Sequence, residues 1–300
     1  MDFTLHQLNV FGMVARHRSM TKAAKELHMT QPAVSIQIKQ LQEALGIPLI
    51  EVIGRQVYLT EAGRHLQKMH QAVDNEIESF YATISQLKGG LEGNLTISAA
   101  STAKYFLPYL LGEFQRRYPN IQVSLKVTNR DEVLGHLTNN EYNLAILTQV
   151  PDDQSIDATP FLDNPLVMCA APDHPLAGQP DINIQQLKGE PFIYRESGSG
   201  TRMVMERYLE EHDITVQPIM ELGTNEAVKQ AIMGGIGISL ISKLSLENEL
   251  TLNKISILDV QGLPIMSRWH TLFKKGKRLS PVTQNFLSFL QENPINRFLP

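Results

Sequence analysis

Residues 19–49 read SMTKAAKELHMTQPAVSIQIKQLQEALGIPL, and this stretch contains the start and stop signals of two helices. Ser19 can cap a helix over 21–27, and Thr30 can cap a longer one over 31–45 that ends at a glycine. The proline at its second position lies in the first turn, where a missing N–H costs nothing. A short helix, a tight link and a longer helix are typical of a helix-turn-helix.

The helix expected over residues 31–45 has two chemically distinct faces. Apolar side chains recur at helical spacing at Val34, Ile38, Leu41 and Leu45. Polar side chains recur on another face at Gln31, Ser35, Lys39 and Gln42. The apolar face can pack on a small core while the polar face enters a DNA major groove, where glutamine can bond adenine and lysine can neutralise phosphate. The periodicity alone also fits an ordinary amphipathic surface helix.

The flanking residues extend this unit in both directions. A first helix starting at residue 5 is indicated by the spacing of Leu5, Leu8, Phe11 and Ala15. Residues 49–53 and 57–59 alternate like two strands around Gly54-Arg55-Gln56, which predicts a hairpin with a cation at its tip. Such a wing can lay Arg55 into the minor groove beside the longer helix.

A single long helix is expected over residues 60–88, roughly 40 Å at ~1.5 Å per residue. Its apolar residues recur at an average step near 3.6, and no glycine or proline lies between Gly63 and Gly89. This stripe exceeds what the small N-terminal unit can cover, so we expect a partner helix; burial within the same chain is the alternative. Gly89-Gly90 and Gly93 then form a joint to the remaining residues.

The pattern of residues 19–49, followed by GRQVYLTEAG at 54–63, resembles that of the LysR-type transcriptional regulators. The resemblance continues through RYP (117–119), DHPLA (173–177) and SGSGTR (197–202). It implies an antiparallel homodimer through the long helix, or a homotetramer, that binds an inverted repeat in double-stranded DNA and recruits RNA polymerase. It also implies DNA contacts by Thr21, Thr30, Gln31, Pro32, Ser35, Gln37, Lys39 and Arg55.

Two positions depart from the family pattern. The arginine common after Ser35 is Ile36 here, and the usual LFER after the proline reads Leu-Ile-Glu-Val, so that Val52 replaces a second cation. We therefore expect weaker DNA binding or more apolar contact with thymine methyl groups.

After Gly93, short β-rich runs alternate with helical stretches such as 105–118 and 225–233. The expected strands are 95–99, 123–127, 144–148, 166–170, 192–194, 219–222 and 238–241. This alternation predicts an open, mostly parallel sheet with helices on both faces. The resemblance implies two lobes, as in periplasmic binding proteins, with a ligand between them.

Ligands of such sheets bind at the carboxyl ends of strands and at the helix N-termini that follow. Hydroxyl, amide and guanidinium groups occur at these positions in Ser101, Thr102, Asn129, Arg130, Thr148, Ser199, Thr201, Arg202, Thr224 and Asn225. Each hydroxyl alone could be a simple helix cap, but together they describe a pocket for a small anion.

The expected fold class is therefore α+β and multidomain. A winged helix-turn-helix occupies residues 1–59, a dimerisation helix 60–90, and a two-lobed α/β effector domain 91–300. The first lobe spans about 91–162 and 266–300, and the second about 163–265. TNRDEV (128–133) and RWHTLFKKGKRLSP (268–281) resemble the CbbR, RbcR and CmpR regulators of carbon-fixation operons. That branch implies a sugar phosphate such as ribulose bisphosphate, phosphoglycolate or NADPH as effector, and no cofactor.

Composition and charge narrow the remaining classes. Residues 1–65 carry two more cations than acids, whereas 91–300 carry five more acids than cations, which fits a nucleic-acid-binding module on an acidic body. One cysteine, Cys169, excludes an internal disulfide or a multi-cysteine metal site. No catalytic motif or metal-ligand spacing occurs, so we expect no enzyme.

Without an apolar leader or a membrane span, the expected location is cytoplasmic. The alternatives are a LysR-type regulator of an unrelated operon and a transport-type solute-binding protein.

Overall fold

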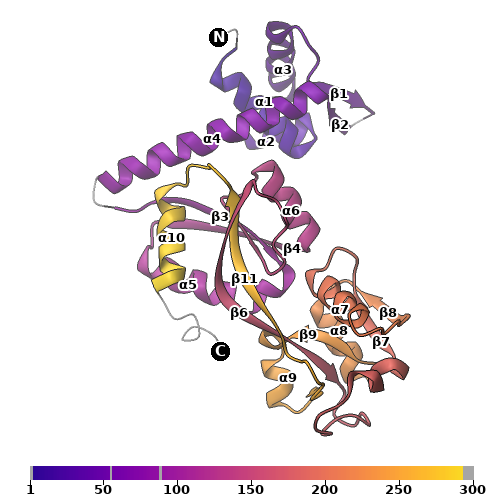
Figure 1. Ribbon diagram of the computed structural model, residues 1–300. Coiled ribbons are helices and arrows are strands. Elements are labelled where there is room, and N and C mark those ends of the chain that lie inside the picture. Colours follow the sequence, from indigo (N-terminus) through magenta and orange to yellow (C-terminus); the bar gives the residue numbers. More distant parts are fainter. Residues whose placement is uncertain (1–2, 55, 88–89, 293–300) are drawn as a thin grey trace. The chain divides into compact units, whose positions relative to one another are not determined.

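The computed structural model describes residues 3–54, 56–87 and 90–292, and its contacts divide the chain into two units (Figure 1). The first unit, Met1–Tyr81, is called the head here, and the second, Ala82–Pro300, the body. Each unit has its own buried apolar core. Gly89 and Arg55 of the expected joint and wing lie outside the described residues, as does Lys88 of the expected long helix.

The head is a three-helix unit followed by a hairpin and a long helix. Its elements are α1 (Leu5–His17), α2 (Met20–Glu26), α3 (Gln31–Leu45), β1 (Ile50–Ile53), β2 (Gln56–Leu59) and α4 (Glu61–Leu87). Both expected caps are confirmed, since the hydroxyls of Ser19 and Thr30 accept the N–H groups of Lys22 and Ala33 at 3.4 and 3.3 Å. Gly46 ends α3 in the left-handed conformation, with φ +67°.

Two expectations about the faces of α3 are wrong. Val34, Ile38 and Leu41 are buried in the head core, but Leu45 remains 37% exposed at the last turn. Gln42 does not belong to the free polar face. Its Oε1 accepts the backbone N–H groups of Leu49 and Ile50 at 2.8 and 3.2 Å, so this side chain fixes the entry into β1.

The body is built on strands that come from both ends of its sequence. Its strands are β3 (Gly93–Ala100), β4 (Ile121–Thr128), β5 (Leu144–Leu147), β6 (Ile156–Ala170), β7 (Phe192–Arg195), β8 (Pro218–Leu222), β9 (Ser239–Ser242), β10 (Ser256–Ile257) and β11 (Ile265–Lys274). Its helices are η1 (Ser101–Tyr105), α5 (Leu107–Arg117), α6 (Arg130–Asn139), η2 (Ile184–Gly189), α7 (Gly200–Glu210), α8 (Asn225–Met233), η3 (Lys243–Ser245), α9 (Glu247–Thr251) and α10 (Pro281–Glu292).

The largest sheet is mixed, so the expectation of a mostly parallel sheet is wrong. Strands follow the order β10-β6-β11-β5-β3-β4, with β9 also paired to β6. Only the β5-β3-β4 part is parallel, and every pairing of β6 and β11 in this sheet is antiparallel. The β7–β8 pair is a separate parallel sheet.

The two long strands β6 and β11 explain this error. The strand expected at residues 166–170 is the end of the fifteen-residue β6, in which Pro160, Asn164 and Pro165 disguise the strand pattern. β11 was not expected at all. The two strands pair from Ile265↔Leu166 to Lys274↔Ile156 and run side by side from one half of the body to the other (Figure 1).

The helix expected over residues 105–118 is shorter in the structure. Ser101–Tyr105 forms the 3-10 turn η1, and α5 begins at Leu107 with a proline in its first turn. The helix expected at 225–233 is confirmed as α8, because Thr224 accepts the N–H of Ala227 at 3.1 Å and caps it.

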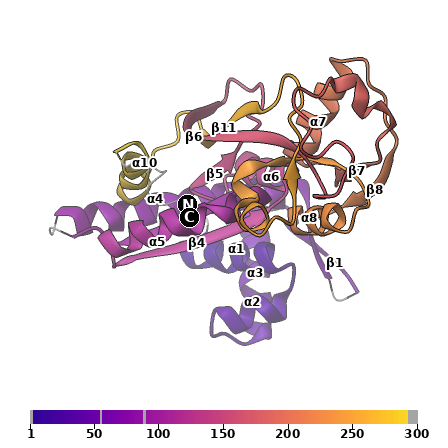
Figure 2. The same cartoon turned by 90° about the horizontal axis from the view of Figure 1, so that it is seen from below.

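Separate apolar cores hold the two halves of the body. Phe106, Phe114 and Trp269 are buried in the first half, under α5 and α10. Phe192 and Tyr208 are buried in the second, which carries α7 and α8. Figures 1 and 2 both show α10 at one end of the body and α7 and α8 at the other. In the part of the chain described, no helix is long and apolar enough to cross a membrane.

Candidate DNA-reading face and effector cavity

The N-terminal half of α3 presents an open polar surface. Gln31, Pro32, Ser35 and Lys39 are exposed, and Gln37 is partly exposed. Thr21 on α2 is also exposed, and Thr30 is occupied as the cap of α3. Lys39 lies 3.7 Å from Glu43, an exposed pair that contact with phosphate can replace. Arg55 lies outside the described residues.

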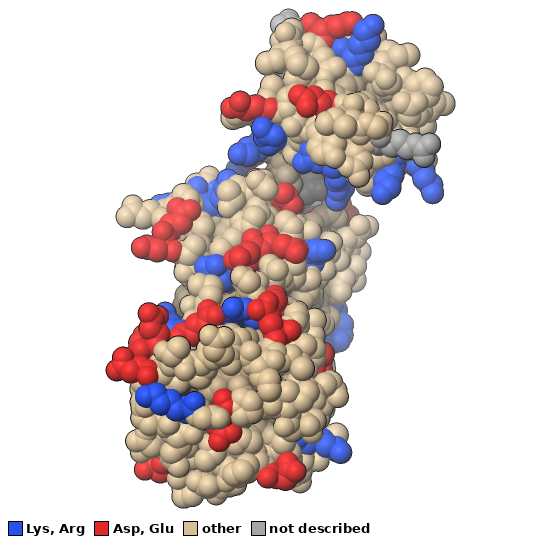
Figure 3. All heavy atoms as spheres, turned by 90° about the vertical axis from the view of Figure 1, so that its right-hand side faces the viewer, with Lys and Arg blue, Asp and Glu red and all other residues tan. Residues whose placement is uncertain are grey.

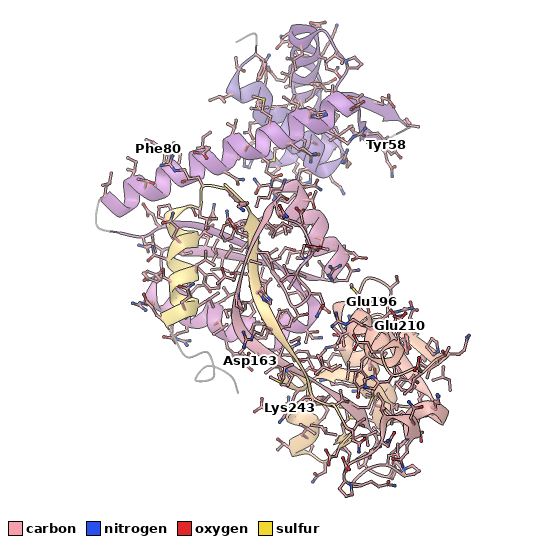
Figure 4. The ribbon with its side chains drawn as sticks, viewed as in Figure 1. Tyr58, Phe80, Asp163, Glu196, Glu210 and Lys243 are labelled. Carbon is pink, nitrogen blue, oxygen red and sulfur yellow. The ribbon has the colours of Figure 1, made fainter. Side chains whose placement is uncertain are left out.

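Apolar side chains stand where the family pattern has cations. Ile36 on α3 is 54% exposed, and Val52 on β1 is 59% exposed. Tyr58, labelled on the hairpin in Figure 4, is also exposed. The head therefore offers methyl and aromatic groups beside its polar face, which suit contact with thymine methyl groups.

An apolar groove lies along α4 of the head. Its lining consists of Leu5, Met69, Ala72, Val73, Glu76, Ile77, Phe80 and Tyr81. Phe80 is 62% exposed and Tyr81 68% exposed, and Figure 4 shows Phe80 projecting from the helix. Exposed aromatic side chains grouped around one apolar groove are typical of interaction surfaces.

In the body, strand ends and helix starts of both halves meet at a cavity of about 20 Å³. Its lining consists of Ala100, Ser101, Thr102, Asn129, Arg130, Thr148, Asn164, Arg195, Ser199, Gly200, Thr201 and Trp269. Seven of the ten residues expected to bind an effector are among them. The rule that ligands bind at strand ends therefore brought together residues that directly follow β3 and β5 and residues at the starts of α6 and α7.

Arg202, Thr224 and Asn225 do not line the cavity. Arg202 instead donates to Glu221 and Glu206 at 2.6 and 2.7 Å. Thr224 is occupied as the cap of α8. Asn225 lies behind the lining, where its Nδ2 donates to Thr102 at 3.1 Å and its Oδ1 accepts from Arg195.

Sequence reasoning missed Arg195, a charged group buried in the cavity wall. The side chain is 3% exposed, donates to the hydroxyl of Ser101 at 3.1 Å, and forms two bonds to Glu196 at 2.7 and 2.8 Å. The sequence contains a signal that could have identified Arg195: a cation directly follows the apolar run 192–194, at the carboxyl end of an expected strand. The bond to Ser101 links the second half of the body to the first.

Asn164 and Trp269 were also missed, and both lie on the unexpected long strands. Asn164 donates to Ser267 at 2.8 Å and accepts from Ser242 at 2.5 Å, which joins β6 to β11 and β9. Trp269 packs against Phe106 with ring centroids 5.0 Å apart. Both residues reach the cavity because β6 pairs with β11, and local sequence does not predict this pairing.

The donors around the cavity suit an anion, although each of its two arginines also has a carboxylate partner, Asp131 for Arg130 and Glu196 for Arg195. Arg130, whose side chain is 13% exposed, donates to the carbonyl of Gln149 at 3.3 Å, and α6 and α7 begin at the cavity. Helix starts carry free N–H groups and partial positive charge. A cavity of this size holds one or two water molecules.

Two glycines at the start of α7 lie close to side chains of the first half of the body. Gly198 has φ +83°, and a Cβ built on it would lie 2.6 Å from a carboxylate oxygen of Asp131 in the other half. A Cβ on Gly200 would meet Arg130 and Thr148 at 3.6 and 3.7 Å. A larger residue at position 198 would therefore require a strained left-handed backbone and a shift of the Asp131 carboxylate.

The one cysteine of the chain lies inside the body. Cys169 is fully buried, and burial raises the pKa of its thiol. Among the described residues, no three His, Cys, Asp or Glu side chains are placed to hold a metal ion. Acidic and basic side chains are interspersed over the face of the body seen in Figure 3.

Comparison with known proteins covers both units. The family of bacterial regulatory helix-turn-helix proteins, lysR family, matches residues 5–64, and the LysR substrate binding domain matches 88–294. The chain is 44% identical to the HTH-type transcriptional activator CmpR of Synechocystis over 96% of this chain and 94% of that protein. It is also 44% identical to the RuBisCO operon transcriptional regulator of Acidithiobacillus ferrooxidans, over 96% and 93%.

A solved structure of a regulatory domain is similar to the body. The Synechocystis CcmR regulatory domain in complex with 2-PG is 46% identical, with a TM-score of 0.65, and the match covers 66% of this chain and 96% of that one.

Proposed function

Because the chain belongs to the LysR family of transcriptional regulators, in the branch of the carbon-fixation regulators CbbR and CmpR, we propose that it controls carbon-fixation genes in response to a small anion. The observation that supports an anionic ligand is the convergence of Arg130, Arg195 and the start of α7 on one cavity. The division into residues 1–59, 60–90 and 91–300 is part of this proposal.

The head reads DNA through the polar face of α3. Gln31 and Ser35 are exposed near the start of the helix, the end that contacts base edges in helix-turn-helix proteins. Lys39 and Thr21 contact phosphate oxygens, and Arg55 enters the minor groove. The protein acts where the chromosome lies, in the cytoplasm.

The apolar groove on α4 is the surface for a second copy of the chain. A homodimer buries Met69, Ile77 and Phe80, which are at least 41% exposed in the single chain. Two-fold symmetry then presents two α3 helices to an inverted repeat. Two such dimers make a homotetramer, and the bound assembly recruits RNA polymerase.

The effector that we propose first is 2-phosphoglycolate, because the similar CcmR domain is solved with 2-PG. Its phosphate and carboxylate match two arginines and the hydroxyls of Ser101, Thr102 and Thr201. Ribulose bisphosphate and NADPH offer the same phosphate chemistry. Regulation requires that the anion bind the closed body and the open body with unequal affinity.

Fluorescence anisotropy on the duplex upstream of the chain's own gene tests this proposal. We expect tight, salt-sensitive binding that a scrambled duplex does not reproduce and that shifts with 2-phosphoglycolate. Thr102→Val and Thr201→Val keep DNA binding and blunt the shift. Selective binding that no anion changes would contradict the effector, and equal affinity for the scrambled duplex would contradict sequence-specific regulation.

A further inference from the structure

Trp269 is the one tryptophan of the chain, and it forms part of the cavity wall. The side chain is 1% exposed, yet its indole Nε1 makes no hydrogen bond within the described part of the chain. Buried N–H groups nearly always have an acceptor, because leaving one unpaired costs free energy. Trp269 thus combines two properties: it lines the cavity, and its one donor has no acceptor among the described residues.

The backbone holds this indole in a defined position. The pairing of β11 with β6 shifts between Trp269 and His270: Trp269 faces Leu162 and His270 faces Pro160, which leaves Phe161 as an extra residue. Bulges of this kind occur beside functional sites and re-aim a side chain. The ring of Phe106 lies 5.0 Å from the indole and 6.2 Å from the ring of Phe161, so Trp269 belongs to a packed aromatic cluster.

The chemistry of the indole selects the kind of ligand atom. Hydroxyls of Ser101, Thr102, Thr148 and Thr201 both donate and accept, whereas Arg130, Arg195 and Trp269 only donate. Phosphate and carboxylate oxygens only accept when ionised. Resting on the proposed effector function, we propose that the Nε1–H of Trp269 donates a hydrogen bond to an oxygen of the bound anion and so makes Trp269 a specificity-determining residue.

The single tryptophan makes this bond directly observable. In the full-length protein labelled with ¹⁵N-tryptophan, the indole gives one N–H resonance. Titration with 2-phosphoglycolate should move its proton resonance downfield, with a midpoint equal to the Kd from calorimetry. Binding heat with an unmoved resonance would overturn the role of Trp269 and leave the effector proposal standing.

Two variants separate the N–H from the packing of the ring. Trp269→Phe keeps an aromatic ring, and biosynthetic replacement of the one tryptophan by benzothienylalanine keeps the bicyclic shape; both lack the N–H. We expect each to weaken 2-phosphoglycolate binding roughly 10- to 100-fold, as for a lost bond to a charged group. Unliganded melting temperature and DNA binding should remain those of the wild type with the benzothienyl isostere.

Phe161→Leu is the matched control, because it loosens the same aromatic cluster without removing a polar atom. It should lower the melting temperature and leave the Kd within about threefold. An unchanged Kd for the benzothienyl protein would overturn the inference. If the wild type binds its operator but gives no heat with 2-phosphoglycolate, ribulose bisphosphate or NADPH, the effector proposal fails, and the role of Trp269 fails with it.

Discussion

On α3 the candidate DNA-reading side chains come from one helix of fifteen residues, whereas the cavity of the body takes its lining from positions as distant as Ala100 and Trp269. The first site is exposed and finds its partners only when DNA arrives. The second is buried, and some of its polar groups, such as those of Arg195 and Ser101, are already bonded to one another, whereas the indole Nε1 of Trp269 has no partner among the described residues. A substitution in α3 should therefore change binding alone, while one in the cavity should change binding and stability together.

Arg195→Ala is expected to have the largest effect, and it tests whether a substitution in the cavity lowers stability. Removing a buried guanidinium leaves Glu196 and Asn225 without their partner and should lower the unfolding free energy of the body by about 3–5 kcal/mol. Urea unfolding followed by Trp269 fluorescence measures it, since the one tryptophan lies in the body. Arg268→Ala is the control: its pair with Asp163 is 65% exposed on both sides and should cost less than about 1 kcal/mol. An equal loss of unfolding free energy in the two variants would contradict the expectation that the buried cavity depends more on its polar contacts than the surface does.

Gly63→Ala tests whether the head also contains a position that tolerates no change. A Cβ on Gly63 would lie 2.0 Å from the backbone oxygen of Leu49, so α4 must shift away from the start of the hairpin. We expect a loss of about 1–3 kcal/mol in stability and weaker operator binding, measured by calorimetric melting and anisotropy. Gly135→Ala in α6 meets nothing within 4 Å and should instead stabilise the body by about 0.5–1 kcal/mol.

Gln31→Ala tests whether a substitution in α3 changes DNA binding alone. If Gln31 reads a base, operator binding should weaken by about 1–3 kcal/mol, while the unfolding free energy stays unchanged because the side chain is exposed. Anisotropy on the operator and on a scrambled duplex measures the difference. The exposed Gln122→Ala in β4 of the body serves as control. An equal loss on both duplexes would reassign Gln31 to phosphate contact.

The smallest effect concerns pH and the partly buried His70 of α4, which packs against Gly12. Burial lowers the pKa of His70 below 6.5, although Asp74 at 3.3 Å acts in the opposite direction. Between that lowered pKa and 6.5, the unfolded chain binds more protons, so acidification below about pH 6.5 should destabilise the head, by at most about 1.4 kcal/mol per pH unit.

Melting followed by circular dichroism between pH 7 and 5 measures this slope, and His70→Gln should reduce it. His270→Gln in the body is the comparison, because burial lowers the pKa of His270 as well. A slope that His70→Gln leaves untouched would remove His70 from the pH response.

The same contrast governs what sequence could predict. The bounds of α3 and α8 followed from local signals, namely the caps Thr30 and Thr224 and the spacing of apolar residues. β6 did not, because its prolines obscure the strand pattern and its partner β11 lies about a hundred residues later. Seven cavity residues followed from the strand-end rule, and Arg195 would have followed from the same rule applied to β7. Trp269 and Asn164 depend on the long-range pairing itself.

The paired strands β6 and β11 also determine how the body can come apart. The chain enters the second half once along β6 and leaves it once along β11. A protease that cuts any single loop of the second half therefore leaves both halves covalently tied, and two cuts are needed to release one. Because of this double attachment, we expect any relative motion of the halves to bend or twist the two-stranded ribbon of β6 and β11.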